Sequence, residues 1–230
     1  RAAGAGNPLP GMIRYAILLH CLWACTTAFC QQSELGLSGG MSLTRLRGNL
    51  FFKQVDPMQG HQFFASYAHY GARGLGYHAQ VVHARMGAAM GIIYSDELGN
   101  ETGRDHIRYR FDHLGLAIGP CYRSPGRAHV VLQAGVMPTT LVKAQVRQPD
   151  PLWSNDVVVT DLTAKAKNPV IFGYGAFGGA VDLNAPFTVG LLVRYDHGLT
   201  TLSRSDFFDT ESIIETSWTV SLSLTYRWPQ

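Results

Sequence analysis

The chain of 230 residues has 46% hydrophobic and 15% charged residues, 25 glycines and a mean hydropathy of +0.01. This balance excludes a disordered chain and a helical membrane protein, and it is enough for one domain with a sizeable core. The 19 basic residues barely exceed the 16 acidic ones, so the charge gives no reason to expect a nucleic-acid partner.

Residues 12–30 read as a secretory signal peptide, because Arg14 precedes an apolar run that ends in small residues. Residues 1–11 come before the expected initiator Met12 and read as extra leader sequence, so the expected mature domain is 31–230. Cys21, Cys25 and Cys30 leave with the signal peptide. The remaining Cys121 cannot form an internal disulfide, and we expect no metal site and no cofactor.

The rest of the chain alternates between apolar and small or polar residues with a period of two, which indicates half-buried β-strands. Stretches rich in turn-forming residues interrupt this pattern. The predicted strands are 34–45, 75–82, 86–94, 106–122, 128–146, 170–183, 187–198 and 217–228. In each of them, the apolar set is expected to face outward and the small or polar set inward, including Met86 and Ala88 on the outward face of 86–94.

The predicted strand 106–122 changes phase in its middle. Odd-numbered residues carry the apolar face over 107–111, and even-numbered residues carry it over 114–118. We expect Ile107, Tyr109 and Phe111 to face outward. A bulge near Asp112 and His113 would produce the slip.

The last predicted strand shows the clearest alternation. Its apolar face has Val and Leu in the middle and aromatic rings at both ends, whereas its other face is Ser, Thr and Arg. This is the profile of a lipid-facing barrel strand, because Trp and Tyr concentrate at the two headgroup levels of a bilayer. The residues expected to face lipid are Trp218, Val220, Leu222, Leu224, Tyr226 and Trp228.

Short and long connections alternate along the chain. The short ones are 83–85, 123–127 and 184–186, and the long ones are 46–74, 96–105, 147–169 and 201–216. Outer-membrane barrels have short periplasmic turns and long extracellular loops, and only sheets closed without an edge span a bilayer. We therefore predict an all-β, eight-stranded antiparallel up-and-down transmembrane β-barrel in the bacterial outer membrane. If the aromatic segment 46–74 forms a hairpin in the wall, the barrel has ten strands.

Six sequence segments carry a family resemblance. They start at Glu34 (ELGLSGGM), Leu114 (LGLAIGPCY), Leu132 (LQAGV), Gly173 (GYGAFGG), Leu192 (LVRYDHGLT) and Leu222 (LSLTYRW). Together they resemble the PorT-type outer-membrane β-barrel domain family of Gram-negative bacteria. The resemblance implies an eight-stranded barrel whose last strand is read by the barrel-assembly machinery. Pro229 and Gln230 after Trp228 depart from that pattern. The family's namesake serves a protein secretion system, whereas most members are called porin-like.

A set of charged residues occupies predicted inward positions near the end of the barrel that carries the long loops. One interpretation is a gate or an anion-binding vestibule. The other is a network of salt bridges that plugs the lumen, which the narrow interior of an eight-stranded barrel favours. The residues of this predicted lumen charge network are Arg108, Arg110, Asp112, Lys143, Arg194 and Asp196.

Residues that could serve catalysis are present near the expected outer rim, but no catalytic motif joins them. The chain has no Gly-x-Ser-x-Gly, no His-Glu-x-x-His and no phosphate-binding loop. We therefore expect no enzyme. The candidates are His61, His69, His106, His197, Asp196, Ser203, Ser205, Asp206 and Asp209.

The expected function is that of a structural or interaction platform in the outer membrane, with secretion-system accessory work as one role. Its expected partners are outer-membrane lipid, the barrel-assembly machinery, and a protein bound through loops 46–74 and 147–169. The aromatic residues of 46–74 have a plainer explanation in local packing. The alternatives are a narrow porin or channel, an enzyme at the rim, and a soluble lipocalin-like binder, which would need an apolar lumen.

Overall fold

The computed structural model describes residues 32–48, 55–149, 157–165, 169–184, 186–202 and 213–228. The expected leader 1–11 and signal peptide 12–30 lie outside these residues. Among the described residues, no helix has the length and apolar composition that crossing a membrane requires.

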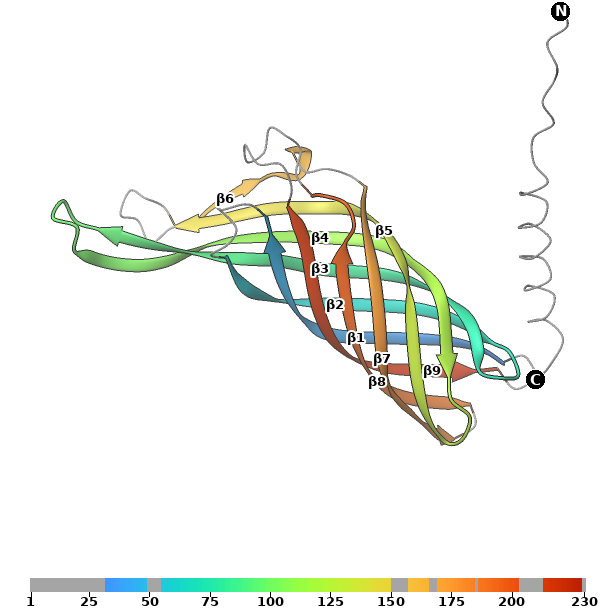
Figure 1. The fold of residues 1–230 in the computed structure, drawn as a ribbon. Coiled ribbons are helices and arrows are strands. Elements are labelled where there is room, and N and C mark those ends of the chain that lie inside the picture. The colour runs from blue at the N-terminus through green and yellow to red at the C-terminus, as the bar shows by residue number, and fades with distance from the viewer. Residues whose placement is uncertain are drawn as a thin grey trace, which may run out of the picture.

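Eight strands close into an antiparallel barrel (Figure 1). Each pairs with the next wall strand along the chain, and the last pairs with the first from Glu34 opposite Arg227 to Arg47 opposite Ile214. This confirms the predicted all-β, eight-stranded up-and-down barrel. The wall strands are β1 (Gln32–Arg47), β2 (Val55–Tyr70), β3 (Leu75–Ser95), β4 (Glu101–Arg123), β5 (Ala128–Pro149), β7 (Val170–Asn184), β8 (Phe187–Gly198) and β9 (Ile214–Arg227).

Two of the predicted strands were wrong, and the errors cancel in the count. The segments 75–82 and 86–94 are one continuous strand, β3, so the predicted turn 83–85 lies inside the wall. The predicted loop 46–74 instead contains the wall strand β2, and the ten-strand alternative is wrong. The alternation of β2 was hidden because both of its faces carry aromatic residues, with Phe63 exposed and Phe64 buried.

The two ends of the barrel differ in their connections. One end, here called the turn end, has the links Gly71–Gly74, 124–127 and 185–186, together with the start of β1 and the end of β9. Gly74 and Gly126 have φ of 74° and 110°, which only glycine adopts without strain. The opposite end, the loop end, has the other four connections. The predicted short turns at 123–127 and 184–186 are confirmed.

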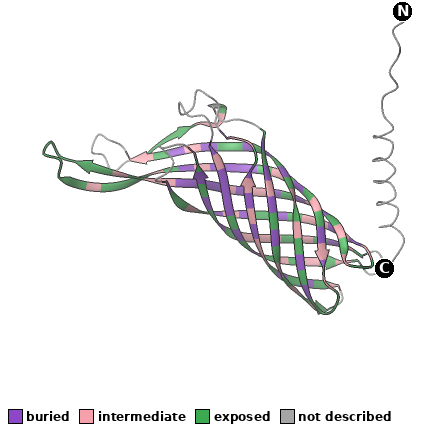
Figure 2. Cartoon of the chain, viewed as in Figure 1, coloured by how far each residue is buried: buried purple, intermediate pink, exposed green. Residues whose placement is uncertain are grey.

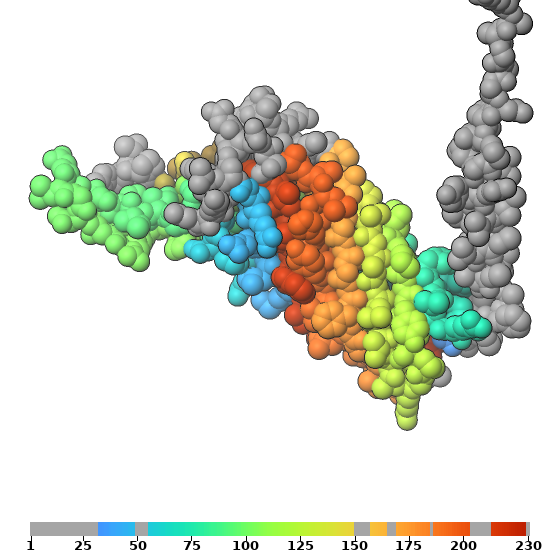
Figure 3. Space-filling model, in the orientation of Figure 1, coloured from blue at the N-terminus to red at the C-terminus, as the bar shows by residue number. Residues whose placement is uncertain are grey.

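At the loop end the sheet continues past the ring. The β3–β4 ladder runs on to Ser95 and Glu101, whereas β2 pairs with β3 only as far as Met90 and β5 pairs with β4 only from Arg108. The result is a projecting hairpin, which Figure 3 shows as an arm (green) that leaves the barrel. The Asn100 amide groups donate to Asp96 at the tip and hold the pKa of that carboxyl below its usual value.

A short strand beside β5 widens the same end. β6 (Val157–Asp161) pairs with the last residues of β5, from Gln145 opposite Asp161 to Pro149 opposite Val157, and the 3-10 turn η2 (Thr163–Lys165) follows it. Every residue of β6 is exposed. β6 is therefore an appendage of the barrel and does not belong to the ring.

The wall strands have an apolar outside over most of their length, and Figure 2 shows exposed and buried residues alternating along them. The six residues predicted to face lipid, five on β9 and Trp228 directly after it, are all exposed, for example Leu222 at 65%. They alternate with Ser217, Thr219 and Ser221, which are buried. The predicted outward residues Leu37, Met41 and Leu43 of β1 are exposed as well. We call this zone the apolar belt.

Between the apolar belt and the loop end, the apolar side chains lie on the inward side of the strands and the polar ones on the outward side. Tyr109 and Phe111 of β4, predicted to face outward, are buried inside, as are Met86 and Ala88 of β3. The outer surface there meets water, so the apolar side chains turn to the interior. They form a core at the loop end together with Leu46, Phe64, Met137, Leu141, Phe172, Leu202 and Ile213.

The predicted bulge on β4 near Asp112 and His113 is wrong, because the extra residue lies on the neighbouring strand β5. The β4–β5 register shifts between these two residues, whose partners are Lys143 and Leu141. Val142 is therefore the extra residue of a bulge on β5. β4 itself keeps one side inward throughout, and its apparent phase change reflects the end of the apolar belt.

The two faces of β9 give a test of the barrel. We expect Leu222→Arg to destabilise the folded barrel by about 2 to 4 kcal/mol, because the guanidinium would enter the middle of the apolar belt. Ser221→Ala removes only one long hydrogen bond to the Leu192 carbonyl at 3.5 Å, and should cost about 1 kcal/mol or less. Urea unfolding in lipid vesicles measures the free energy of unfolding of both variants. If both lose the same amount, the two faces of the strand are misassigned.

Candidate functional site: a filled lumen and a basic outer rim

A network of charged side chains closes the lumen at the turn end. Arg123 of β4 contacts Glu34 of β1, and its Nη2 lies 2.8 Å from Oδ1 of Asp182 on β7. Arg227 of β9 bridges the same two carboxylates at 3.2 and 2.8 Å, and His129 of β5 lies 3.0 Å from Asp182. Two arginines thus share two carboxylates, and the network ties five wall strands together across the lumen.

A second network fills the middle of the barrel. Arg194 of β8 donates from Nε to Asp196 Oδ1 at 2.7 Å and from Nη1 to Gln80 Oε1 at 2.9 Å. Gln62 donates to the second oxygen of Asp196 at 3.1 Å, and Gln80 donates to Gln133 Oε1 at 3.1 Å. The chain of contacts crosses the lumen from β2 and β3 to β5 and β8. Each charge in it therefore has a partner, as burial of a charge requires.

Aromatic rings complete the surroundings of Arg194. Its guanidinium carbon lies 4.0 Å from the centroid of Tyr174 and 5.1 Å from that of Phe64. The Tyr174 hydroxyl and His78 Nε2 are 2.6 Å apart. A cation on the faces of two rings is stabilised where water is excluded. Arg194, with its side chain 4% exposed, is thus held as a fixed element of the interior.

The loop end is closed by the apolar core, which contains one polar pair. His113 Nε2 lies 2.9 Å from Glu215 Oε2, and both side chains are almost completely buried. The His113 ring also meets Phe172 edge to face, with centroids 5.6 Å apart. Side chains of β4, β7 and β9 therefore meet across the lumen at this level.

Little open space remains inside. A cavity of about 50 Å³ lies between the two charged networks, with Ser38, Gln80 and Gln133 in its lining. This volume holds a few water molecules at most. A wider hollow of about 320 Å³ at the turn end stops at Arg123 and Arg227. The two charged networks and the apolar core thus place buried side chains at three levels of the lumen.

The predicted lumen charge network is only partly present. Arg194 and Asp196 face the lumen and pair with each other. Arg108 and Lys143 are exposed, Arg110 is half-buried, and Asp112 pairs with Arg85 outside the lumen. Four of the six residues were assigned to the wrong face, because the predicted phase change on β4 does not occur and the bulge on β5 turns Lys143 outward.

Those misplaced residues belong to a basic rim on the outside of the barrel. Arg85 of β3 donates to Asp112 of β4 from Nε at 2.6 Å and from Nη2 at 3.2 Å. Arg108 of β4 lies directly opposite Arg147 of β5 in the ladder, and Arg110 lies opposite Gln145. We call Arg85, Arg108, Arg110 and Arg147 the arginine cluster. It lies just above the apolar belt, on three adjacent strands.

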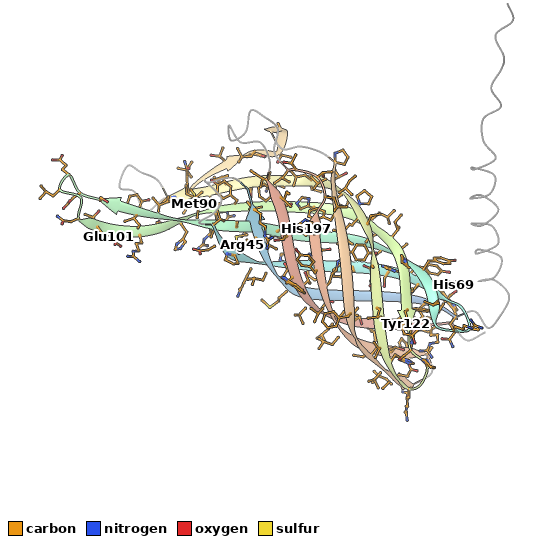
Figure 4. All side chains as sticks on the ribbon, in the orientation of Figure 1. Arg45, His69, Met90, Glu101, Tyr122 and His197 are labelled. Atoms are coloured by element: carbon orange, nitrogen blue, oxygen red, sulfur yellow. The ribbon has the colours of Figure 1, made fainter. Side chains whose placement is uncertain are left out.

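The candidate catalytic residues are not assembled into a site. His61 lies near His83 (ring centroids 6.1 Å apart), His69 Nδ1 contacts the Ser33 hydroxyl at 3.1 Å, and His197 stacks on Tyr195. These contacts are on three separate parts of the wall. In Figure 4, His69 is at the turn end and Glu101 at the tip of the projecting hairpin. Ser203, Ser205, Asp206 and Asp209 lie outside the described residues, and within those described, no His, Cys, Asp and Glu group could hold a metal ion.

The turn-end network was missed from the sequence, although its signal was present. Glu34 and Arg227 have the same strand parity as the small inward residues Gly36 and Thr225. The alternation of faces along a strand is therefore enough to predict that Glu34 and Arg227 face inward. The pairing of Arg123 with Glu34 needs the closure of the ring, which brings β1 and β4 to the same level across the lumen.

No protein-family model and no curated protein matches the sequence. Solved structures that are similar include Ail, the attachment invasion locus protein of Yersinia pestis (13% identity, 85% of this chain, 99% of that chain, TM-score 0.40). Neisserial surface protein A is also similar, with 8% identity and a TM-score of 0.46 over 83% of this chain and 96% of that one. OprG of Pseudomonas aeruginosa has 10% identity and a TM-score of 0.44 over 88% of this chain and 97% of that one. The outer membrane protease OmpT of Escherichia coli matches with 10% identity and a TM-score of 0.43 over 86% of this chain and 96% of that one.

These TM-scores describe loose superpositions, so the fold assignment rests on the strand register of the chain itself. All nine pairings are antiparallel, and the ring is closed by β9 on β1. A closed wall with an apolar exterior has its backbone satisfied and its surface matched to hydrocarbon. The chain is a closed eight-stranded β-barrel whose outer surface suits a lipid bilayer.

The Arg194 network predicts coupled stability effects. Arg194→Met should destabilise the barrel by about 3 to 5 kcal/mol, because Asp196 would keep a buried charge with only Gln62 as its partner. In the double variant Arg194→Met/Asp196→Asn that charge is gone. We expect the double variant to lose about 1 to 3 kcal/mol less free energy of unfolding than the two single variants lose in sum. Urea unfolding in vesicles measures all three losses.

Arg104→Met is the matched control, because Arg104 pairs with Glu101 on the exposed hairpin. It should leave the unfolding midpoint unchanged. If the double variant loses as much free energy of unfolding as the two single variants together, Arg194 and Asp196 are not paired in the lumen.

Proposed function

We propose that the protein is an outer-membrane platform that binds a protein partner through its loop end, and that it does not conduct solutes. The observation that carries this proposal is the filled lumen, with a charged network at the turn end, the Arg194 network in the middle and an apolar core at the loop end. The turn end is then periplasmic and the loop end extracellular, as in barrels with short periplasmic turns.

The loop end offers extended structure to a partner. The projecting hairpin of β3 and β4 exposes Ile93, Tyr94 and Leu98, and β6 exposes Val157, Val158 and Val159. Exposed apolar side chains above the membrane favour protein contact. Of the two loops expected to bind a partner, 147–169 supplies β6. The other, 46–74, is largely wall, so we assign its role to the hairpin.

The PorT-type resemblance supports one particular role, accessory work for a protein secretion system, since the family's namesake has that role. The same resemblance supports contact between β9 and the barrel-assembly machinery. Surrounding outer-membrane lipid is the remaining partner. A narrow channel is the alternative, and the filled lumen argues against it.

Planar-bilayer recordings test the closed lumen. We expect no conductance steps above background from the purified barrel, whereas a 16-stranded porin reconstituted in the same way should conduct. Conductance steps whose ion selectivity changes in Arg194→Gln would contradict the proposal and establish a channel through the Arg194 network.

Site-specific photo-crosslinking tests the platform. We expect a photoreactive residue at Leu98, which is 86% exposed on the hairpin, to give a discrete protein adduct in intact cells. The same residue at Leu222, in the apolar belt, should give none. Identical adducts at both positions would contradict a partner site on the hairpin.

A further inference from the structure

An open groove runs along the outer surface of the barrel within the apolar belt. It has a volume of about 790 Å³, and Gly39 and Ala65 are among the small residues that line it, between the larger Leu37, Phe63 and Val81. A second groove of about 590 Å³ continues it and shares Leu37, Ala65 and Val81. We call the two together the outer groove. In a bilayer an apolar hollow of this size is filled by hydrocarbon chains, because the side chains around an empty hollow would lose dispersion contacts.

The outer groove leads directly to the arginine cluster. His83 of β3 lines the groove, and the next outward residue on that strand is Arg85. Leu114 of β4 also lines it, and Arg110 lies four residues further toward the loop end. Four residues of strand span about 13 Å, or about 9 Å of height at a tilt of 45°. That height is comparable to the polar headgroup layer.

Among the described residues, the arginine cluster has an excess of positive charge that no ion pair balances. Asp112 is engaged by Arg85. None of the ion pairs between described residues includes Arg108, Arg110 or Arg147. Arg108 and Arg147 are direct cross-strand partners, and like charges in that position repel. A bound anion would remove this repulsion.

We propose that the outer groove and the arginine cluster form one binding site for an outer-leaflet lipid whose headgroup carries two or more phosphates. The acyl chains lie in the outer groove, and the phosphates accept hydrogen bonds from Arg108, Arg110 and Arg147. A guanidinium offers paired donors that match phosphate oxygens. This site depends on the membrane location of the barrel, and it is independent of the partner proposed for the hairpin.

Lipid titration of the delipidated full barrel in detergent tests the site. The probes are bis-phosphorylated lipid A, the same lipid without phosphates, and inorganic pyrophosphate, with bound lipid counted by native mass spectrometry. We expect the bis-phosphorylated lipid to bind tightest. The variant Arg108→Gln/Arg110→Gln/Arg147→Gln should bind it at least about tenfold more weakly, and Ala65→Phe, which fills the groove, should weaken it several-fold.

Two variants of the same kind are controls. Arg104→Gln removes an exposed arginine on the hairpin, and Ala134→Phe adds a ring on β5 at an exposed position that is not among the groove residues. Neither should change lipid binding. A slower migration of the boiled than of the unboiled variant on a gel verifies that each barrel is folded.

Three results would overturn the proposal. They are equal binding of the lipid without phosphates, binding of pyrophosphate as tight as that of the lipid, and equal losses in the arginine variant and in Arg104→Gln. Each of them would leave the closed lumen and the hairpin partner untouched. Failure of the barrel to enter membranes would instead contradict the proposed function.

Discussion

The structure depends on closure of the sheet by the β9–β1 ladder. A bilayer offers no hydrogen bonds to an open edge, so every backbone group of the wall must find a partner in a neighbouring strand. Closure fixes which side of each strand faces in. Outward positions must then suit hydrocarbon within the apolar belt and water above it, whereas inward positions must fit a lumen that eight strands make narrow.

Filling that lumen explains the charged interior. Arg123 is buried and Arg227 is half-buried, and both pair with Glu34 of β1 and Asp182 of β7, whereas the buried Arg194 pairs with Asp196 of its own strand. Breaking such a pair leaves an uncompensated charge, so the pairs tie the register of strands that do not touch in the wall. The same filling directs function to the outer surfaces, namely the projecting hairpin, β6 and the arginine cluster above the outer groove.

The sequence predicted what strand alternation alone determines. The all-β class and the exposed face of β9 followed from the period of two, and the turn-forming residues located the links at 123–127 and 184–186. The count of eight strands was right only because one strand was predicted as two and β2 was missed. The alternation failed where the surroundings change. His83 and Arg85 resembled a turn because outward residues become polar as β3 leaves the apolar belt. Phe111 resembled a lipid-facing residue because nothing in the sequence marks the height at which the belt ends.

Site-directed spin labelling along β4 tests the central claim most directly, namely that one strand keeps its sides while its surroundings change. Single labels at positions 107 to 118 would be placed in a Cys121→Ala background and reconstituted in lipid. We expect labels at 114, 116 and 118 to be accessible to oxygen, labels at 108 and 110 to a water-soluble nickel complex, and labels at 109, 111 and 117 to neither. Oxygen accessibility at 109 and 111 would contradict the account, because it would return the phase change to β4 and the arginines to the lumen.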